Sequence, residues 1–238
     1  MKTTCSDTLN YTLKRSNRKS LGLSIERDGA VIVRAPFKAG DEEIEKFISE
    51  KRIWIQQKLS RKQSVTREKP AREFVNGQGF LYLGKSYRLR LLNNDEFILG
   101  EDRNGAALHL RYGHFELPES EKRNAQRHFI AWYKHKTEKK LSERIPRYDK
   151  RLGIKVEKYK ISDLGHRWAS HSGTGIININ WRTIMAPIWV FDYILVHEMS
   201  HMIERPHSKK FWRIVARVIP DYEEHIHWLS ENGVELDL

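Results

Sequence analysis

The sequence predicts an α+β fold, with an antiparallel β-rich N-terminal part followed by a helix-rich part. Short segments in which apolar and polar residues alternate dominate as far as about residue 115. After Pro118, longer segments with apolar residues at helical spacing take over. The single cysteine, Cys5, excludes a disulfide framework, so the fold depends on its hydrophobic core. We therefore expect two parts, residues 9–115 and 119–238.

The first part is expected to form strands around one helix. The alternating segments LGLSIE and AVIVRAP flank Asp28-Gly29, a pair suited to a tight hairpin turn. A helix is predicted from Asp41, and the charged segment SRKQSVTREKPARE is predicted to be a linker after it. Further short alternating segments, from Phe80 onward, predict an antiparallel meander.

The second part is expected to be mainly helical, with two short strands. A long helix is predicted from Pro118 to about Ile145, where Pro146 should end it. The segments IKVEKYKIS and GIININW have the pattern of strands, and the helix IWVFDYILVHEMSHMI is predicted after Pro187. Ser208 is expected to cap one more helix, KKFWRIVARVI.

Polar side chains of the second part stand in an apolar segment. Between Thr183 and Ile203, only Asp192 and Glu198 are charged at neutral pH, so the segment is expected to be buried. A buried imidazole or carboxylate is costly unless another group pairs with it. His197, Glu198 and His201 therefore need partners, and a metal ion would be one.

The spacing of these residues is that of a catalytic metal site. His197 and His201 are four residues apart, so on a helix they can direct ring nitrogens at one ion. Glu198 is placed to accept a proton from water at that ion, as in the HExxH motif. Pro206 predicts a turn that brings His207 back toward the pair. Three histidines with an open fourth position are typical of catalytic zinc.

Two alternatives for these side chains stay open. The histidines could be core residues that hydrogen-bond to their neighbours. Glu204, three residues after His201, could replace His207 as the third ligand, although His207 would then have no role.

The residues around this motif show a family resemblance. The run RWASHSGTGIININWRTIMAPIWVFDYILVHEMSHMIERPHSKKFWRIVARVIPDY resembles the YgjP-like (DUF45) metallopeptidases, in which a WGS-type turn, a strand, a PxxVxDYVxxHEL helix and an HSxxFW segment follow in this order. The upstream run RSNRKSLGLSIERDGAVIVRAPF extends the resemblance to residues 11–233. It implies a zincin-like catalytic core in residues 119–238, zinc on His197, His201 and His207, and Glu198 as the base. The zinc segment is also similar to the SprT-like proteases.

One turn departs from the family pattern. Where the family has WGSCS, this chain has WASHS at residues 168–172, and Ala169 indicates that no positive φ is required there. His171 is either a surface residue or a substrate contact. Arg167 and His171 are the candidate donors to a developing oxyanion. The strand GIININW could pair with an extended peptide substrate.

The net charge of +12 lies mostly outside the histidine-rich segment. Residues 121–160 hold 14 Lys and Arg against 5 acids, whereas residues 161–238 hold 7 against 10. The basic segments are either solvated helix faces or a patch that attracts phosphates. A nucleotide or a nucleic acid is therefore a second class of partner.

The leading hypothesis is a zinc-dependent hydrolase, most simply a metallopeptidase that acts on peptides or proteins. The alternatives are a metal-dependent nucleotide pyrophosphatase at the same site and a noncatalytic nucleic-acid-binding protein with structural zinc. The sequence lacks an apolar segment of signal-peptide or membrane-spanning length, so it predicts a soluble, cytoplasmic protein with no membrane contact.

Overall fold

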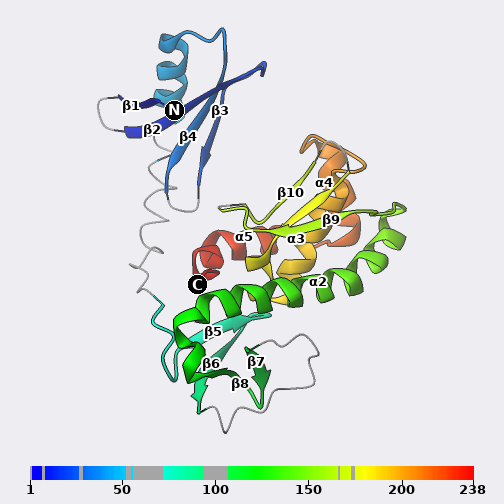
Figure 1. Ribbon diagram of the computed structural model, residues 1–238. Helices are drawn as coiled ribbons and strands as arrows, with labels where there is room; N and C mark the ends of the chain where they lie inside the picture. Colours follow the sequence, from blue (N-terminus) through cyan, green and yellow to red (C-terminus); the bar gives the residue numbers. More distant parts are fainter. Residues whose placement is uncertain are drawn as a thin grey trace. The chain divides into compact units, whose positions relative to one another are not determined.

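The computed structural model describes residues 2–6, 9–26, 29–51, 55, 72–93, 107–165, 167–172 and 175–238 (Figure 1). The chain divides into two compact units, residues 1–69 and 70–238, each with its own hydrophobic core. Strands and helices together make the fold α+β, as predicted. Most of the predicted linker lies outside the described residues, and so do residues 94–106 of the meander predicted from Phe80 onward.

The first unit is a four-stranded sheet packed against a helical segment at residues 41–51. Its strands are β1 (Lys2–Ser6), β2 (Leu9–Ser16), β3 (Gly22–Ile25) and β4 (Val31–Pro36), in the order β1-β2-β4-β3. The predicted hairpin is confirmed, because β3 and β4 pair antiparallel and Gly29 has a φ of 87°. However, β2 and β4 pair in parallel, so this sheet is mixed rather than antiparallel.

The second unit begins with another mixed sheet. Its strands are β5 (Gly79–Tyr82), β6 (Lys85–Leu92), β7 (His109–Arg111) and β8 (His114–Pro118), in the order β5-β6-β8-β7. The predicted antiparallel meander is wrong here, because β8 enters between β6 and β7 and pairs with β6 in parallel. Alternation of apolar residues predicts which face a side chain occupies, but not which strand lies beside it.

Helix α2 (Ala125–Leu152), preceded by η1 (Glu119–Asn124), lies between the two sheets of this unit (Figure 1). In its first half, Phe129 packs on Phe80 and Phe115, with ring centroids 4.1 and 5.0 Å apart. In its second half, Arg144 forms an ion pair with Asp192 at 3.3 Å. The domain boundary predicted between residues 115 and 119 thus falls inside one unit, since β5–β8 share a core with α2.

Pro146 does not end α2, contrary to the prediction. The helix continues to Leu152 and ends at Gly153, which has a φ of 70°. Proline removes the hydrogen bond to the carbonyl of Ser142, but Ser142 is exposed, so water can bond that carbonyl instead. Tyr148 and Leu152, two and six residues after Pro146, are buried, and their packing favours a continuous helix.

The rest of the unit is a small sheet and three helices. The strands are β9 (Tyr159–Ser162), β10 (Ala169–His171) and β11 (Ile177–Asn180); the other elements are η2 (Trp181–Met185), α3 (Ile188–Ser200), α4 (Lys209–Val218), α5 (Tyr222–Asn232) and η3 (Gly233–Glu235). The order β10-β11-β9 places β11, the strand GIININW, in the centre. Since both of its edges are paired, the prediction that it accepts a peptide strand is wrong.

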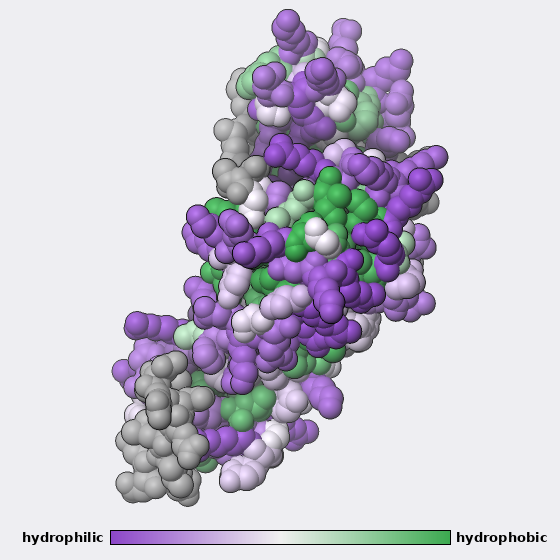
Figure 2. All heavy atoms as spheres, turned by 90° about the vertical axis from the view of Figure 1, so that its right-hand side faces the viewer, coloured by the Kyte–Doolittle hydropathy of each residue, from purple (hydrophilic) through white to green (hydrophobic). Residues whose placement is uncertain are grey.

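Hydrophilic side chains predominate on the face of the molecule shown in Figure 2. Among the described residues, no helix is both long enough and apolar enough to cross a bilayer.

Candidate metal centre

Helix α3 carries two of the predicted ligands into the interior. After Ile188 and Trp189 in its first turn, its apolar residues are almost wholly buried: Val190, Phe191, Ile194, Leu195, Val196 and Met199 are at most 4% exposed. A helix that is apolar on most sides is largely surrounded by protein, here by β10, β11, α2, α4 and α5. His197 and His201 lie one turn apart at its C-terminal end, with ring centroids 5.0 Å apart.

His207 reaches this pair because α3 ends at Ser200. The N–H groups of Ile203 and Glu204 donate to the carbonyl of Ser200, at 3.0 and 2.9 Å, and close a tight turn. The chain then reverses through residues 205–208 before α4 begins. The predicted turn is confirmed.

The three imidazoles converge. One nitrogen from each ring lies within 4.8 Å of the other two, and Nε2 of His207 is 2.9 Å from Nε2 of His197. The ring centroid of His207 lies 4.7 Å from that of His201. Nitrogens bound to one tetrahedral zinc ion would be about 3.3 Å apart, given zinc–nitrogen distances of about 2.0–2.1 Å. The donor set therefore fits a single ion of this size.

Phe211 of α4 supports all three rings. It is fully buried, and its ring centroid lies 4.9, 4.6 and 4.8 Å from those of His197, His201 and His207. Ser208 caps α4 as predicted, since its Oγ accepts a hydrogen bond from the N–H of Phe211 at 3.2 Å. The contact of Phe211 with the histidines could not be predicted from the sequence, because it depends on the turn before α4.

Two of the histidines have oxygen partners at Nδ1. The hydroxyl of Tyr193 lies 3.4 Å from Nδ1 of His197, and the carbonyl of Glu204 lies 3.3 Å from Nδ1 of His201. With the Nδ1 proton directed at these oxygens, Nε2 of each ring carries the lone pair that a metal ion needs. Tyr193 was not predicted, although its position four residues before His197 was a usable signal.

Burial favours the neutral form of two of these imidazoles. It lowers the pKa of His197 to about 3, with contributions from His201 and His207. Burial and the neighbouring His201 also lower the pKa of His207. Because only the neutral imidazole binds a metal ion, these shifts favour a ligand role at neutral pH.

Glu198 is a buried carboxyl group beside the histidines. It is 7% exposed, and burial raises its pKa to about 7. No side chain of the described residues donates a hydrogen bond to it. A carboxyl group in this environment is suited to exchange protons near neutral pH.

Glu198 and the three histidines line a cleft of about 510 Å³. Its lining consists of Arg167, Ala169, Ser170, His171, His197, Glu198, His201, Arg205 and His207. Both predicted donors, Arg167 and His171, thus lie in the cleft. Arg205 was missed, because its position depends on the turn after α3. No residue of the basic segment 121–160 lines the cleft.

His171 lies in β10 and is half-buried. Its ring centroid is 6.4 Å from that of His201, and burial, His201 and Arg205 lower its pKa. Its Nε2 is enclosed but makes no hydrogen bond within the described structure. A buried polar atom without a partner is unusual and is available to a bound ligand. Ala169, in the same strand, has no positive φ, as predicted.

The buried Asn180 fixes the segment that carries Arg167. Its Nδ2 donates to the carbonyls of Arg167 and Gly165, at 2.8 and 3.3 Å. Its Oδ1 accepts from the N–H of Arg182 at 3.1 Å. These three hydrogen bonds attach the segment that precedes β10 to the end of β11.

A metallopeptidase is a class of protein that this arrangement fits, because an open group of three histidines beside a buried glutamate is what activation of water for hydrolysis requires. The chain belongs to the YgjP-like family: the model of the YgjP-like metallopeptidase domain matches residues 19–232. A comparison with curated proteins finds no match. Among solved structures, the chain is similar to the crystal structure of the metallopeptidase zymogen of Pyrococcus abyssi abylysin, with a TM-score of 0.36 and 24% identity over 38% of this chain and 93% of that chain.

Proposed function

We propose that the protein is a zinc-dependent peptidase in which His197, His201 and His207 hold the metal and Glu198 is the general base. The observation that carries this proposal is the convergence of three imidazole nitrogens beside a buried carboxyl group. Imidazole ligands suit a borderline ion such as zinc better than magnesium or calcium. When bound, such an ion acts as a Lewis acid that polarises a carbonyl and acidifies water.

The contacts of Glu204 favour His207 as the third ligand. One carboxylate oxygen of Glu204 lies 3.2 Å from Oγ of Ser208, and the other lies 3.2 Å from Nζ of Lys210. These contacts satisfy the carboxylate outside the group of histidines. Only the main-chain carbonyl of Glu204 contacts the group of histidines, where it faces Nδ1 of His201.

Metal analysis tests the ligand assignment. We expect one equivalent of zinc in the wild type, a similar loss of zinc in His201→Ala and His207→Ala, and retention in Glu204→Ala. If Glu204→Ala lost the metal and His207→Ala retained it, the third ligand would be misassigned.

The chain's own residues then perform the proton transfers. Glu198 accepts a proton from the attacking water and returns it to the leaving nitrogen. Arg167 and His171 line the same cleft and donate hydrogen bonds to the oxyanion as it forms. The enclosed Nε2 of His171 would gain a partner in this step.

The strand β10 supplies the edge for an extended peptide. Within the described structure it pairs only with β11, and all three of its residues line the cleft. A peptide that adds to this edge gains main-chain hydrogen bonds and passes the histidines. This role replaces the one predicted for GIININW.

Hydrolysis of a phosphoanhydride is the second candidate function. Arg167 and Arg205 in the cleft favour it, whereas the basic segment 121–160 does not reach the site. The zinc-loaded protein should be incubated with unfolded proteins, peptides and nucleoside triphosphates, with Glu198→Gln as the control. Peptide cleavage that Glu198→Gln abolishes supports the proposal. Triphosphate hydrolysis without peptide cleavage would replace it, and hydrolysis of neither would favour a noncatalytic role.

A further inference from the structure

The outer face of the sheet β5–β8 carries a row of basic side chains. Arg88 of β6 is the direct neighbour of His114 of β8, and His114 is the direct neighbour of Arg111 of β7. Direct neighbours in a sheet project from the same face. Since strands lie about 4.8 Å apart, the three side chains form a line about 10 Å long.

The opposite face of these strands is buried. Leu89 and Phe115, which alternate with the basic residues, are fully buried in the core that includes α2. This alternation directs Arg88, His114 and Arg111 outward. Arg88 is exposed, and the other two are partly exposed, so a ligand can reach the row.

Among the described residues of these strands and their turns, positive charge predominates. Residues 79–93 and 107–118 contain four Lys and Arg but a single acid, Glu116. Glu116 lies in the neighbouring row, 4.0 Å from Arg90. Within the described residues, Arg88 has no carboxylate partner. Arg88 and Arg111 lie on either side of His114, so an anion along the row would meet two guanidinium groups.

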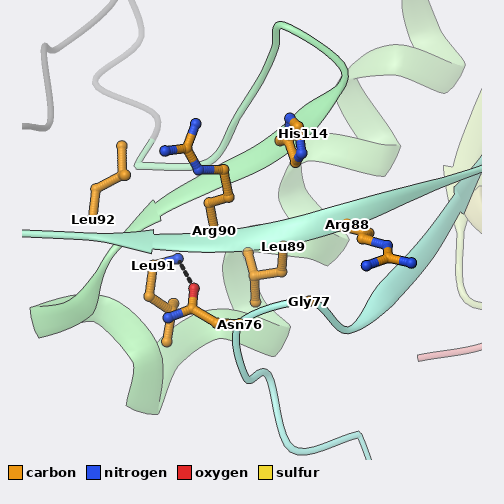
Figure 3. Close-up of a pocket in the computed structure, with 8 residues that line it drawn as sticks. All are labelled: Asn76, Gly77, Arg88, Leu89, Arg90, Leu91, Leu92 and His114. Atoms are coloured by element: carbon orange, nitrogen blue, oxygen red, sulfur yellow. Dashed lines mark hydrogen bonds between the residues drawn. The ribbon is translucent and has the colours of Figure 1, made fainter.

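A cavity of about 420 Å³ opens along β6 beside this row. Arg88, Arg90 and His114 line it. Figure 3 shows Arg90 and His114 on the same side of the two strands, while Leu89 lies on the other side of β6. Arg90 thus adds a fourth basic side chain next to the row.

Tyr112 stands beside the row in the turn between β7 and β8. It is 92% exposed, and its φ of 47° is followed by a φ of 79° at Gly113. Such two-residue turns favour asparagine before glycine, so a tyrosine there is strained and gains nothing from burial. Nδ1 of His114 donates to the carbonyl of Tyr112 at 3.0 Å and ties the turn to the row. An exposed ring beside cations is typical of a surface that stacks bases.

We propose that this face binds single-stranded nucleic acid. Arg88, His114 and Arg111 contact successive parts of the phosphate backbone, and Tyr112 stacks on an unpaired base. Stacking and phosphate contacts together tolerate any sequence, so binding is not sequence-specific. A duplex presents no free base face to Tyr112 and should bind more weakly. The proposal is independent of the metal centre.

Fluorescence anisotropy of a labelled 12-nucleotide oligo(dT) with the full-length, zinc-loaded protein tests this inference over a range of salt concentrations. Each phosphate contact on a single strand contributes about 0.7 to the slope of log K against log salt. Arg88→Ala/Arg111→Ala should therefore lower the slope by about 1.4. Lys155→Ala/Lys158→Ala, at exposed positions outside this sheet, removes the same charge and should leave the slope unchanged.

Tyr112→Asn tests the stacking separately. Asparagine tolerates the left-handed conformation, so this variant should keep the turn while losing the ring. We expect oligonucleotide binding to weaken roughly 5- to 150-fold with no change in the salt slope. An unchanged circular dichroism melt would show that the fold is intact.

Three results would overturn the proposal. One is no binding of oligo(dT) at low salt. The second is an equal loss of salt slope in the two double variants, which would indicate only general positive charge. The third is binding of duplex as tight as that of the single strand and insensitive to Tyr112→Asn.

Discussion

Phe211 links the stability of α4 to the metal centre. Its ring is fully buried and lies less than 5 Å from the three imidazole centroids, at 4.9, 4.6 and 4.8 Å. Phe211→Ala should cost about 3–5 kcal/mol of unfolding free energy in the metal-free protein, because a cavity replaces the ring. At about 2–4 °C per kcal/mol, the melting temperature should fall by about 6–20 °C. The imidazoles also lose their support, so zinc affinity should fall about 10- to 100-fold.

Phe80→Ala is the matched control for this prediction. Phe80 is 1% exposed and packs on Phe115 and Phe129, away from the histidines. Both variants should show similar losses of melting temperature without metal. Competition with a chromophoric chelator, well below the melting temperature, should show weakened zinc binding in Phe211→Ala alone. Equal zinc affinities in wild type and Phe211→Ala would refute the supporting role of this ring.

Three further changes probe individual contacts. Tyr193→Phe should weaken zinc binding about 10-fold with little change in melting temperature, because it removes only the oxygen 3.4 Å from Nδ1 of His197; a chelator titration that shows unchanged affinity would contradict this. Asn180→Ala should lower the unfolding free energy by about 1–3 kcal/mol, because the carbonyl of Arg167 loses its hydrogen bond to the Asn180 side chain. Because this bond positions Arg167 and not the histidines, KM should rise while zinc content changes little. Pro146→Ala should raise the melting temperature, since it removes the ring clash and restores a helical hydrogen bond, which together cost a helix about 3 kcal/mol. A fall in melting temperature would show that the proline ring packs favourably.

The metal centre could be predicted where local rules decide the geometry. Four-residue spacing places His197 and His201 on one side of a helix, and Pro206 favours the turn that returns His207 to them. The positions of Phe211 and Arg205 could not be predicted, because they depend on how α4 packs after that turn.

The same local rules could not predict the order of the strands in each sheet. The burial of Leu89 and Phe115 agrees with the alternation of these strands, but the parallel pairing of β6 with β8 depends on the path of the chain between them. Pro146 shows the converse case, in which a local rule predicted the end of α2 and the burial of Tyr148 overrode it.

Turnover per bound zinc in wild type and Glu198→Gln tests the proposed mechanism most directly. Glutamine is nearly isosteric with glutamate but cannot accept a proton from water, so zinc content and melting temperature should be unchanged. Loss of a general base should lower turnover about 100- to 10,000-fold. If Glu198 only balanced charge in the buried helix, turnover per bound zinc would be similar in the two proteins. That result would contradict its assignment as the base, and with it the mechanism proposed for this cleft.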